Sequence, residues 1–382
     1  MTHRPKIAFV WMNFTEYHVD RLRAAQDALP GYEVVGVELA AKTLHYDWGR
    51  PDFGRIRVDT LMPQPYETIP VWRRTWALLR WVLAERPQAL ICCHYEEIAV
   101  LCSALVMRLM GRLVATMIDS KWEDKPRHLW REGIKRLFLA PYHAALVGSR
   151  GTARYLEYFG FAPSRLFFGY DTVSVVRLRE LAGDCAAGLA FGDRPIVVVS
   201  RLIGKKNLPG LLDAYALYRR RCGGAARRLE VLGSGPLEAM LRARIARDGI
   251  EGVSFHGFVT QRDLARHLSC ALCLVLFSTV EQWGLAVNEA VALKIPVVVS
   301  DAVGARDFLV RTEINGAVVE PDNIDGLAAI LLRLSCNPEL WQAWRDGSQT
   351  FTASADTGGF AASVAAIIDC SGSIDTGPGG LR

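Results

Sequence analysis

The stretch CLVLFSTVEQWGLAVNEAVALKIPVVVSD, residues 273–301, contains two short apolar runs separated by a segment of helical length. The runs at 273–278 and 296–301 are nearly continuous in Val, Leu and other apolar residues, which is typical of parallel strands covered on both faces. A strand, a helix and a second strand in this order predict part of an open α/β sheet.

The same alternation extends through the whole chain. Helical patterns in the first half include 71–86, 96–110 and 149–159, and helical segments also separate the strands of the second half. We therefore predict an α/β protein with two doubly wound, Rossmann-like domains facing across a cleft. The predicted strands are 6–11, 32–39, 88–95, 112–119 and 144–149, then 195–200, 228–233, 253–258, 273–278, 296–301 and 316–321.

The length of 382 residues is large for one hydrophobic core, which also favours two domains. Weak periodicity over 167–195 places the join there, so we predict an N-terminal domain at 1–175 and a C-terminal domain at 176–365. The Gly, Ser and Pro content near the end predicts a flexible tail at 366–382.

Composition limits where the protein works. Nine cysteines, scattered through apolar runs, indicate reduced thiols and a cytoplasmic location. No uncharged apolar run approaches the ~18 residues that span a bilayer. The apolar run near the N-terminus is too short, and is followed too soon by polar residues, for a signal peptide. Attachment to the inner face of the cell membrane stays open, and the net charge of +5 lies entirely in residues 1–175.

Polar residues that follow predicted strands are the candidate ligand contacts, because open α/β sheets bind ligands beyond the carboxyl ends of their strands. Arg201 and Lys206 follow one strand and suit a diphosphate, although they could also be solvated loop cations. Glu281 follows another, and Glu289 lies one turn into the next helix. The two carboxylates could bind sugar hydroxyls, or could simply stabilise a helix start. Gly233 could border a ligand or only form a tight turn.

Several of these residues belong to motifs that occur in a fixed order. They read S-R-L-x-x-x-K-N from Ser200, G-S-G-P from Gly233, F-H-G-F-V from Phe255 and E-x-W-G-L-x-x-x-E-A from Glu281. Over about 195–335 the chain resembles the retaining nucleotide-sugar glycosyltransferases of family 4, which have the GT-B fold. The resemblance implies these donor-binding residues: Arg201, Lys206, Gly233, Phe258, Val259, Glu281, Trp283, Gly284, Leu285 and Glu289.

The resemblance also implies an activity. A sugar would pass, with retention of its configuration, from a nucleoside-diphosphate sugar to a hydroxyl of a glycan or lipid-linked acceptor, in cell-surface polysaccharide or glycolipid biosynthesis. No metal or other cofactor is expected, since cations, amides and a helix dipole would stabilise the departing diphosphate. Family members often have a glycine-rich loop after the first strand, whereas residues 11–22 contain no glycine. An inactive scaffold subunit and a nucleotide-sugar epimerase therefore remain alternatives.

The acceptor side is less specific. His94 and Asp119 each end a predicted strand of the first domain, where the family often has a His near the reacting carbon. Together with Glu281 they are the candidate catalytic residues, and His94 and Asp119 could equally be polar strand ends.

Two Trp- and cation-rich segments, 71–87 and 121–139, have the pattern of helices that lie on an anionic membrane. In 71–87 the stripe is Trp72, Trp76, Leu79 and Leu83, flanked by arginines that include Arg74. Helices that pack between domains with solvated arginines have the same pattern. The modest charge and the absence of a binding motif argue against nucleic acid.

Overall fold

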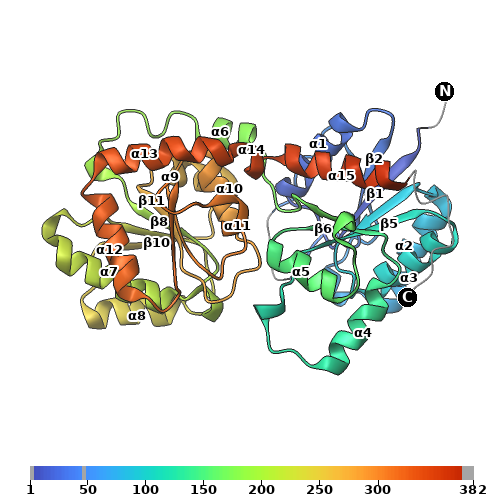
Figure 1. The fold of residues 1–382 in the computed structure, drawn as a ribbon, viewed down its shortest axis with the longest axis horizontal. Coiled ribbons are helices and arrows are strands. Elements are labelled where there is room, and N and C mark those ends of the chain that lie inside the picture. The colour runs from blue at the N-terminus through green and yellow to red at the C-terminus, as the bar shows by residue number, and fades with distance from the viewer. Residues whose placement is uncertain (1–3, 45–48, 372–382) are drawn as a thin grey trace. The chain divides into compact units, whose positions relative to one another are not determined.

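The structure, a computed structural model, describes residues 4–44 and 49–371, which form two compact units (Figure 1). The first unit contains the chain up to Thr172 and again from Thr357, and the second contains Val173–Asp356. Each has one parallel sheet with helices on both faces, so the prediction of two doubly wound α/β domains is confirmed.

The sheet of the first unit has the order β3-β2-β1-β4-β5-β6-β7. Neighbouring residues of β1 enter opposite cores: Phe9 packs with α1 on one face and Val10 with α2 and α3 on the other. The sequence missed β3 and β7, which are short and lie at the sheet edges. The strands are β1 (Lys6–Trp11), β2 (Glu33–Glu38), β3 (Arg57–Thr60), β4 (Ala89–Cys92), β5 (Leu113–Ile118), β6 (Ala144–Val147) and β7 (Leu166–Phe168).

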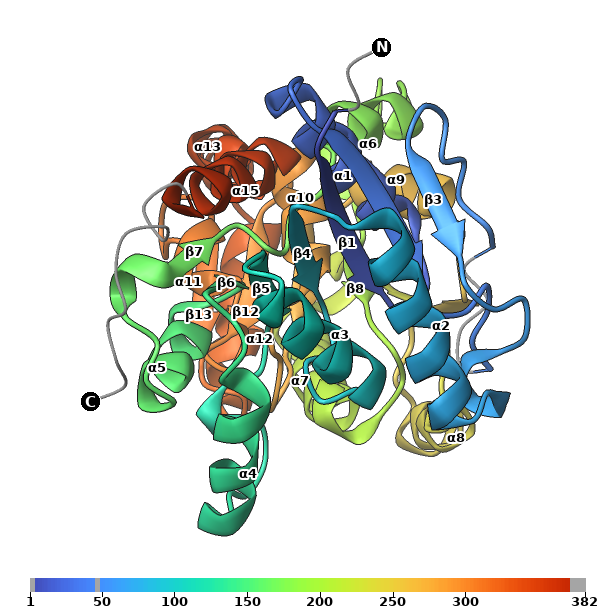
Figure 2. The ribbon, with the colours of Figure 1, turned by 90° about the vertical axis from the view of Figure 1, so that its right-hand side faces the viewer.

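Helices of the first unit divide between the two faces. On one face α15 (Thr357–Ser371) packs against α1 (Glu16–Ala28) (Figure 1). On the other lie α2 (Val71–Glu85) and α3 (Ile98–Leu109), side by side in Figure 2, with α4 (Leu129–Leu139) and α5 (Arg150–Tyr158). No helix among the described residues is both long and apolar enough to cross a membrane.

The sheet of the second unit has the order β10-β9-β8-β11-β12-β13. The order reverses between β8 and β11, and such a switch point is where ligands of open α/β sheets bind. All six predicted strands of this half are confirmed. They are β8 (Ile196–Val199), β9 (Leu229–Leu232), β10 (Val253–Gly257), β11 (Cys273–Leu276), β12 (Val297–Ser300) and β13 (Gly316–Val319).

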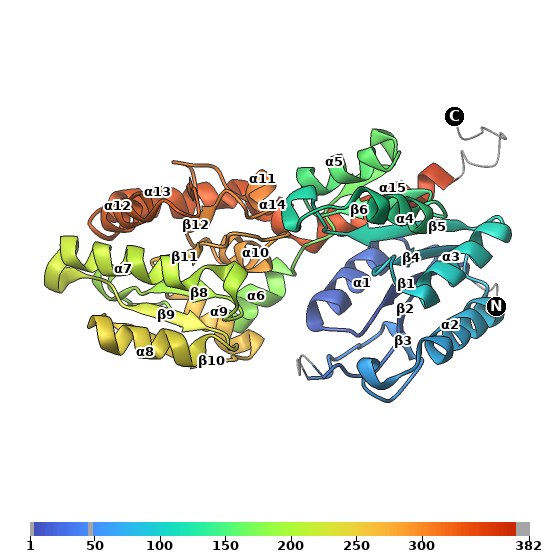
Figure 3. The ribbon, with the colours of Figure 1, turned by 90° about the horizontal axis from the view of Figure 1, so that it is seen from below.

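The second sheet is also covered on both faces. One face carries α7 (Leu208–Cys222), α8 (Glu238–Asp248), α12 (Ile324–Ser335) and α13 (Pro338–Ser348), with α7 packed on α12 (Figure 3). The other carries α9 (Gln261–Ser269), α10 (Leu285–Ala292) and α11 (Arg306–Leu309). Two further helices of this unit, α6 (Val175–Ala182) and α14 (Thr352–Ala355), pack against α10.

The structure corrects the domain boundaries. The predicted C-terminal domain, 176–365, and the tail, 366–382, divide a helix that belongs to the first unit: α15 begins at Thr357 and its described residues reach 371. Phe360, Val364, Ile367 and Ile368 are buried in the first unit's core. These four residues recur at helical spacing, but the Gly and Ala residues around them make the segment resemble a linker in sequence. Residues 372–382 of the predicted tail lie outside the described residues.

Replacing Phe360, which is fully buried, tests whether α15 stabilises the first unit. Phe360→Ala should lower the free energy of unfolding by about 3–5 kcal/mol, because it leaves a cavity in a packed core. Denaturant unfolding measures this, with the exposed Asp369→Ala on the same helix as a control expected to stay within ~0.5 kcal/mol. Equal stability of the two variants would show that α15 is dispensable.

Candidate functional site

The second unit places two predicted site loops at its switch point. Arg201 follows β8 and Glu281 follows β11, and these two strands are direct neighbours in the sheet. Arg201 is exposed, whereas Glu281 is 7% exposed. The loop after β8 therefore offers a cation to solvent beside a largely buried carboxylate.

An ion pair joins the two loops. The Lys206 ammonium contacts Oε2 of Glu281, and the Ser278 hydroxyl donates a hydrogen bond to the same oxygen at 3.3 Å. The backbone N–H of Thr279 donates to the Lys205 carbonyl at 2.9 Å, which fixes the loops against each other. The structure thus brings together the predicted diphosphate cation and the predicted sugar-binding acid.

Gly233 has a packing role in this arrangement. Its φ of 134° favours glycine, and a Cβ there would lie 2.0 Å from the Ser200 carbonyl oxygen. Its N–H donates to the Gly257 carbonyl at 2.7 Å. The glycine is required because three loops meet at the strand ends, independently of any ligand.

Gly284 and Trp283, two of the expected donor contacts, also have packing roles. A Cβ at Gly284 would meet Leu276 Cδ2 at 2.8 Å, so the absence of a side chain lets this segment pack against the protein's own core. The Trp283 side chain is buried, and its indole N–H donates to Asn288 Oδ1 at 2.7 Å. Gln282, Gly284 and Leu285, at the start of α10, are half-buried and remain accessible for ligand contact.

The other predicted donor contacts lie on α10 and after β10. Glu289 is the fifth residue of α10 and is 2% exposed. Phe258 is 55% exposed just beyond β10, while Val259 packs on the core. An exposed ring at a strand end can stack on a flat heterocycle, and the N–H groups of the first turn of α10 favour an anion.

The first unit holds a polar cluster beyond the carboxyl ends of β1, β4 and β5. His94, after β4, has a φ of 58°, which is uncommon for a residue other than glycine. The charge on the Cys93 sulfur, opposed by burial, raises the pKa of His94 to about 9. Burial opposes ionisation of Cys93, but His94 and the Tyr170 hydroxyl, 3.3 Å from the sulfur, hold the pKa of Cys93 below its usual value.

Asp119, which follows β5, has a carboxylate neighbour. Burial raises the pKa of Asp119 well above its ordinary range, and the charge and hydrogen bonding of Asp171 raise it further. Arg21 of α1 lies 3.5 Å from Asp171 Oδ1 and donates to the Thr172 carbonyl at 3.1 Å. A second carboxyl group beside the first disfavours its ionisation.

Sequence reasoning missed Arg21, Cys93, Tyr170 and Asp171. Tyr170 and Asp171 follow β7, a strand of three residues that was not predicted. Recognising Leu166–Phe168 as a strand would have placed Asp171 at the same sheet edge as Asp119. Arg21 lies in a helical pattern that shows nothing unusual in sequence.

Asp119→Asn should change how stability depends on pH. An unfolded Asp ionises near pH 4, and because the folded pKa is higher, stability is lost as pH rises from about 4 through the folded pKa. The variant lacks this loss. Its free energy of unfolding relative to wild type should therefore increase between acid and neutral pH, by about 1.4 kcal/mol for each unit of pKa shift. The difference in melting temperature between variant and wild type should increase in the same direction. Asp369→Asn, on an exposed position, is the control. Parallel pH profiles for Asp119→Asn and wild type would contradict the raised pKa of Asp119.

Comparison with solved structures defines the class of fold. Sucrose-phosphate synthase from Thermosynechococcus elongatus has a TM-score of 0.73 at 19% identity, covering 97% of this chain and 100% of that one. HepE from Anabaena, in complex with UDP and glucose, has a TM-score of 0.73 at 15% identity, covering 96% and 100%. The two Rossmann-like domains are those of the GT-B fold.

Sequence comparison adds the family. Residues 188–350 match the family described as Glycosyl transferases group 1. Alpha-D-kanosaminyltransferase of Streptomyces kanamyceticus is 31% identical over 153 residues, 39% of this chain and 38% of that protein. The GDP-mannose-dependent alpha-(1-6)-phosphatidylinositol monomannoside mannosyltransferase of Mycobacterium tuberculosis is 30% identical over 200 residues, 49% of this chain and 51% of that protein.

The matched part of the chain spans about half, or less, of the length of these curated relatives. The family model itself matches residues 188–350 of this chain. This segment contains Arg201, Lys206, Glu281 and Glu289, so the ion pair described above lies inside the family's own region.

Proposed function

We propose that the protein is a retaining glycosyltransferase that moves a sugar from a nucleoside-diphosphate sugar to a hydroxyl of a glycan or lipid-linked acceptor. The observation that carries the proposal is the Lys206–Glu281 ion pair at the switch point of a group 1 glycosyltransferase domain. A cation held there against a carboxylate can exchange that carboxylate for a phosphate.

The donor would redistribute these contacts. Its diphosphate takes Lys206 and Arg201, and Glu281, released from Lys206, accepts hydrogen bonds from the sugar hydroxyls. Glu289 accepts from the ribose, and the base lies against Phe258 and Val259. In the transition state negative charge grows on the departing diphosphate, and the two cations with the first N–H groups of α10 stabilise it without a metal ion.

The first unit would supply the acceptor side. Asp119, whose pKa is raised by burial, can form a hydrogen bond with an acceptor hydroxyl, and His94, whose pKa is raised by the charge on Cys93, can orient an acceptor oxygen. Proton NMR of the first product formed tests the proposed retention: the new glycosidic bond should have the anomeric configuration of the donor.

Donor binding is the direct test of the site. A thermal-shift panel that includes UDP-glucose and GDP-mannose should find a nucleotide sugar that raises the melting temperature. For that donor, Arg201→Ala and Lys206→Ala should weaken binding by about 10–100-fold, because each removes a hydrogen bond to a charged group. Isothermal calorimetry should show a smaller loss for the free nucleoside, which lacks the diphosphate.

Two variants complete this experiment. Lys205→Ala, which removes the exposed neighbouring cation, should bind the donor as wild type does. Glu289→Gln keeps the shape of the side chain and should still weaken binding. If Arg201→Ala and Glu289→Gln both bind the donor normally, the site is misassigned. If donor binds but no sugar reaches any acceptor, the scaffold alternative gains support.

A lipid-linked acceptor would lie at a membrane surface, and the exposed side chains of α2 suggest where the protein could bind one. On α2, Trp72 and Trp76 are 70% and 66% exposed, and Leu83 is exposed as well. Arg74 corrects the expectation of solvated arginines: it is buried and pairs with Glu97 at 3.2 Å. Because Trp72, Trp76 and Leu83 are exposed, this side of α2 faces away from the core of the first unit. The opposite side packs into that core through Leu78, Trp81 and Val82.

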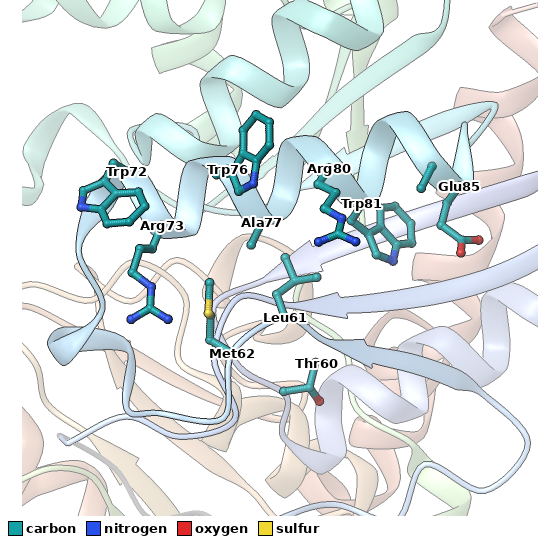
Figure 4. Close-up of a pocket in the computed structure, with 11 residues that line it drawn as sticks. Thr60, Leu61, Met62, Trp72, Arg73, Trp76, Ala77, Arg80, Trp81 and Glu85 are labelled. Carbon is teal, nitrogen blue, oxygen red and sulfur yellow. The ribbon is translucent and has the colours of Figure 1, made fainter.

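Neighbouring elements add to this surface. Figure 4 shows Trp72, Arg73, Trp76 and Arg80 along α2, above Leu61 and Met62, where they line a pocket of 510 Å³. A separate group of exposed apolar side chains lies on α4, namely Leu129, Trp130, Ile134 and Leu137, next to Arg131, Lys135 and Arg136 in sequence. Exposed Trp and Leu beside cations fit an anionic lipid surface.

Flotation with vesicles tests the membrane proposal. The protein should bind vesicles of phosphatidylglycerol and phosphatidylcholine better than phosphatidylcholine alone, and salt should weaken the binding. Trp72→Ala with Trp76→Ala should weaken it at least about tenfold, because two large side chains no longer enter the lipid. The control is Val176→Ala, another exposed apolar residue but on the second unit. Equal binding by both variants would refute this surface.

A further inference from the structure

A cluster of two histidines and one carboxylate lies in the second unit, separate from the Lys206–Glu281 ion pair. Among the described residues, Glu230, His256 and His267 form a group whose ligating atoms all lie within 4.8 Å of one another. Glu230 is on β9, His256 on the edge strand β10 and His267 on α9. Three separate elements therefore converge on one point.

The geometry is close to that of a bound ion. His267 Nδ1 lies 2.8 Å from Glu230 Oε2, and His256 Nε2 lies 3.8 Å from the same oxygen. Tetrahedral zinc with bonds of about 2.0–2.2 Å requires ligand atoms roughly 3.3 Å apart. Each of the two histidine–Glu230 contacts therefore needs to change by about half an ångström, and the two histidine nitrogens, which lie within 4.8 Å of each other, need to approach by side-chain rotation.

Backbone structure and exposure suit a ligand site. The register of β10 against β9 shifts between Phe255 and Gly257, so His256 is the extra residue of a bulge, a device that re-aims a side chain. The side chains of His256, His267 and Glu230 are 31%, 29% and 15% exposed, so solvent reaches the cluster.

The charges around the three side chains suit a bound metal ion. The Glu230 carboxylate lies between the two imidazoles, and its contact with His267 Nδ1 is short enough for a hydrogen bond when no metal is bound. Asp263 adds a second negative charge near His267, while Arg228 acts on Glu230 with the opposite sign. A dication bound between these side chains keeps the Glu230 carboxylate compensated.

We propose that Glu230, His256 and His267 bind a zinc ion, with water as the fourth ligand. Two histidines and one carboxylate are a known ligand set for zinc with an open position. The ion would pin the edge strand β10 to α9. Since Phe258 lies two residues after His256, binding would also restrict the loop that carries this exposed ring.

Metal binding to the full chain tests the proposal without any sugar donor. One equivalent of Co²⁺ should give the visible absorption of a tetrahedral nitrogen- and oxygen-ligated site, and Zn²⁺ should displace it and raise the melting temperature. His256→Ala and His267→Ala should each weaken Zn²⁺ binding in calorimetry at least ~10-fold, since even changes beyond the ligands have such effects.

Two controls make the result decisive. His128→Ala removes an exposed histidine of the first unit and should bind Zn²⁺ as wild type does. The cysteines in the chain could bind metal elsewhere, and the charge-transfer bands of Co²⁺–thiolate would reveal this. Wild-type binding that survives in His256→Ala and His267→Ala, thiolate bands only, or no binding at all would each overturn the proposal.

Discussion

The ion pair between Lys206 and Glu281 is the contact on which the site of the second unit depends. Both side chains are nearly buried, at 13% and 10% exposed, and charges in such positions are costly unless each is compensated. The Ser278 hydroxyl and the backbone bond between Thr279 and Lys205 support the pair from the loops themselves. The loops after β8 and β11 are thus joined at the switch point by an interaction that a phosphate can replace.

The first unit uses a different electrostatic device at the equivalent place in its own sheet. There the strand order reverses between β1 and β4, and beyond the strand ends titratable side chains lie beside one another, with Asp171 also paired to Arg21. Burial and Asp171 raise the pKa of Asp119, and the charge on Cys93 raises the pKa of His94. The second unit is thus suited to hold an anion, and the first to form hydrogen bonds with neutral hydroxyls.

Much of this could be predicted from the sequence, because buried parallel strands are continuous apolar runs that punctuate the chain. All eleven predicted strands are present, and the motif residues Lys206 and Glu281 meet as the order of strands requires. What the sequence did not show shares a cause, namely packing partners that only the folded chain brings into contact. The role of α15 depends on α1, the roles of Gly284 and Trp283 depend on Leu276 and Asn288, and Asp171 gains its meaning only beside Asp119.

The most direct test is a crystal structure of the full chain with the nucleoside-diphosphate sugar that raises its melting temperature most. We predict that the Lys206 ammonium will have left Glu281 for an oxygen of the diphosphate, and that Glu281 will accept hydrogen bonds from the sugar. A complex in which the diphosphate binds elsewhere while Lys206 still contacts Glu281 would contradict the account.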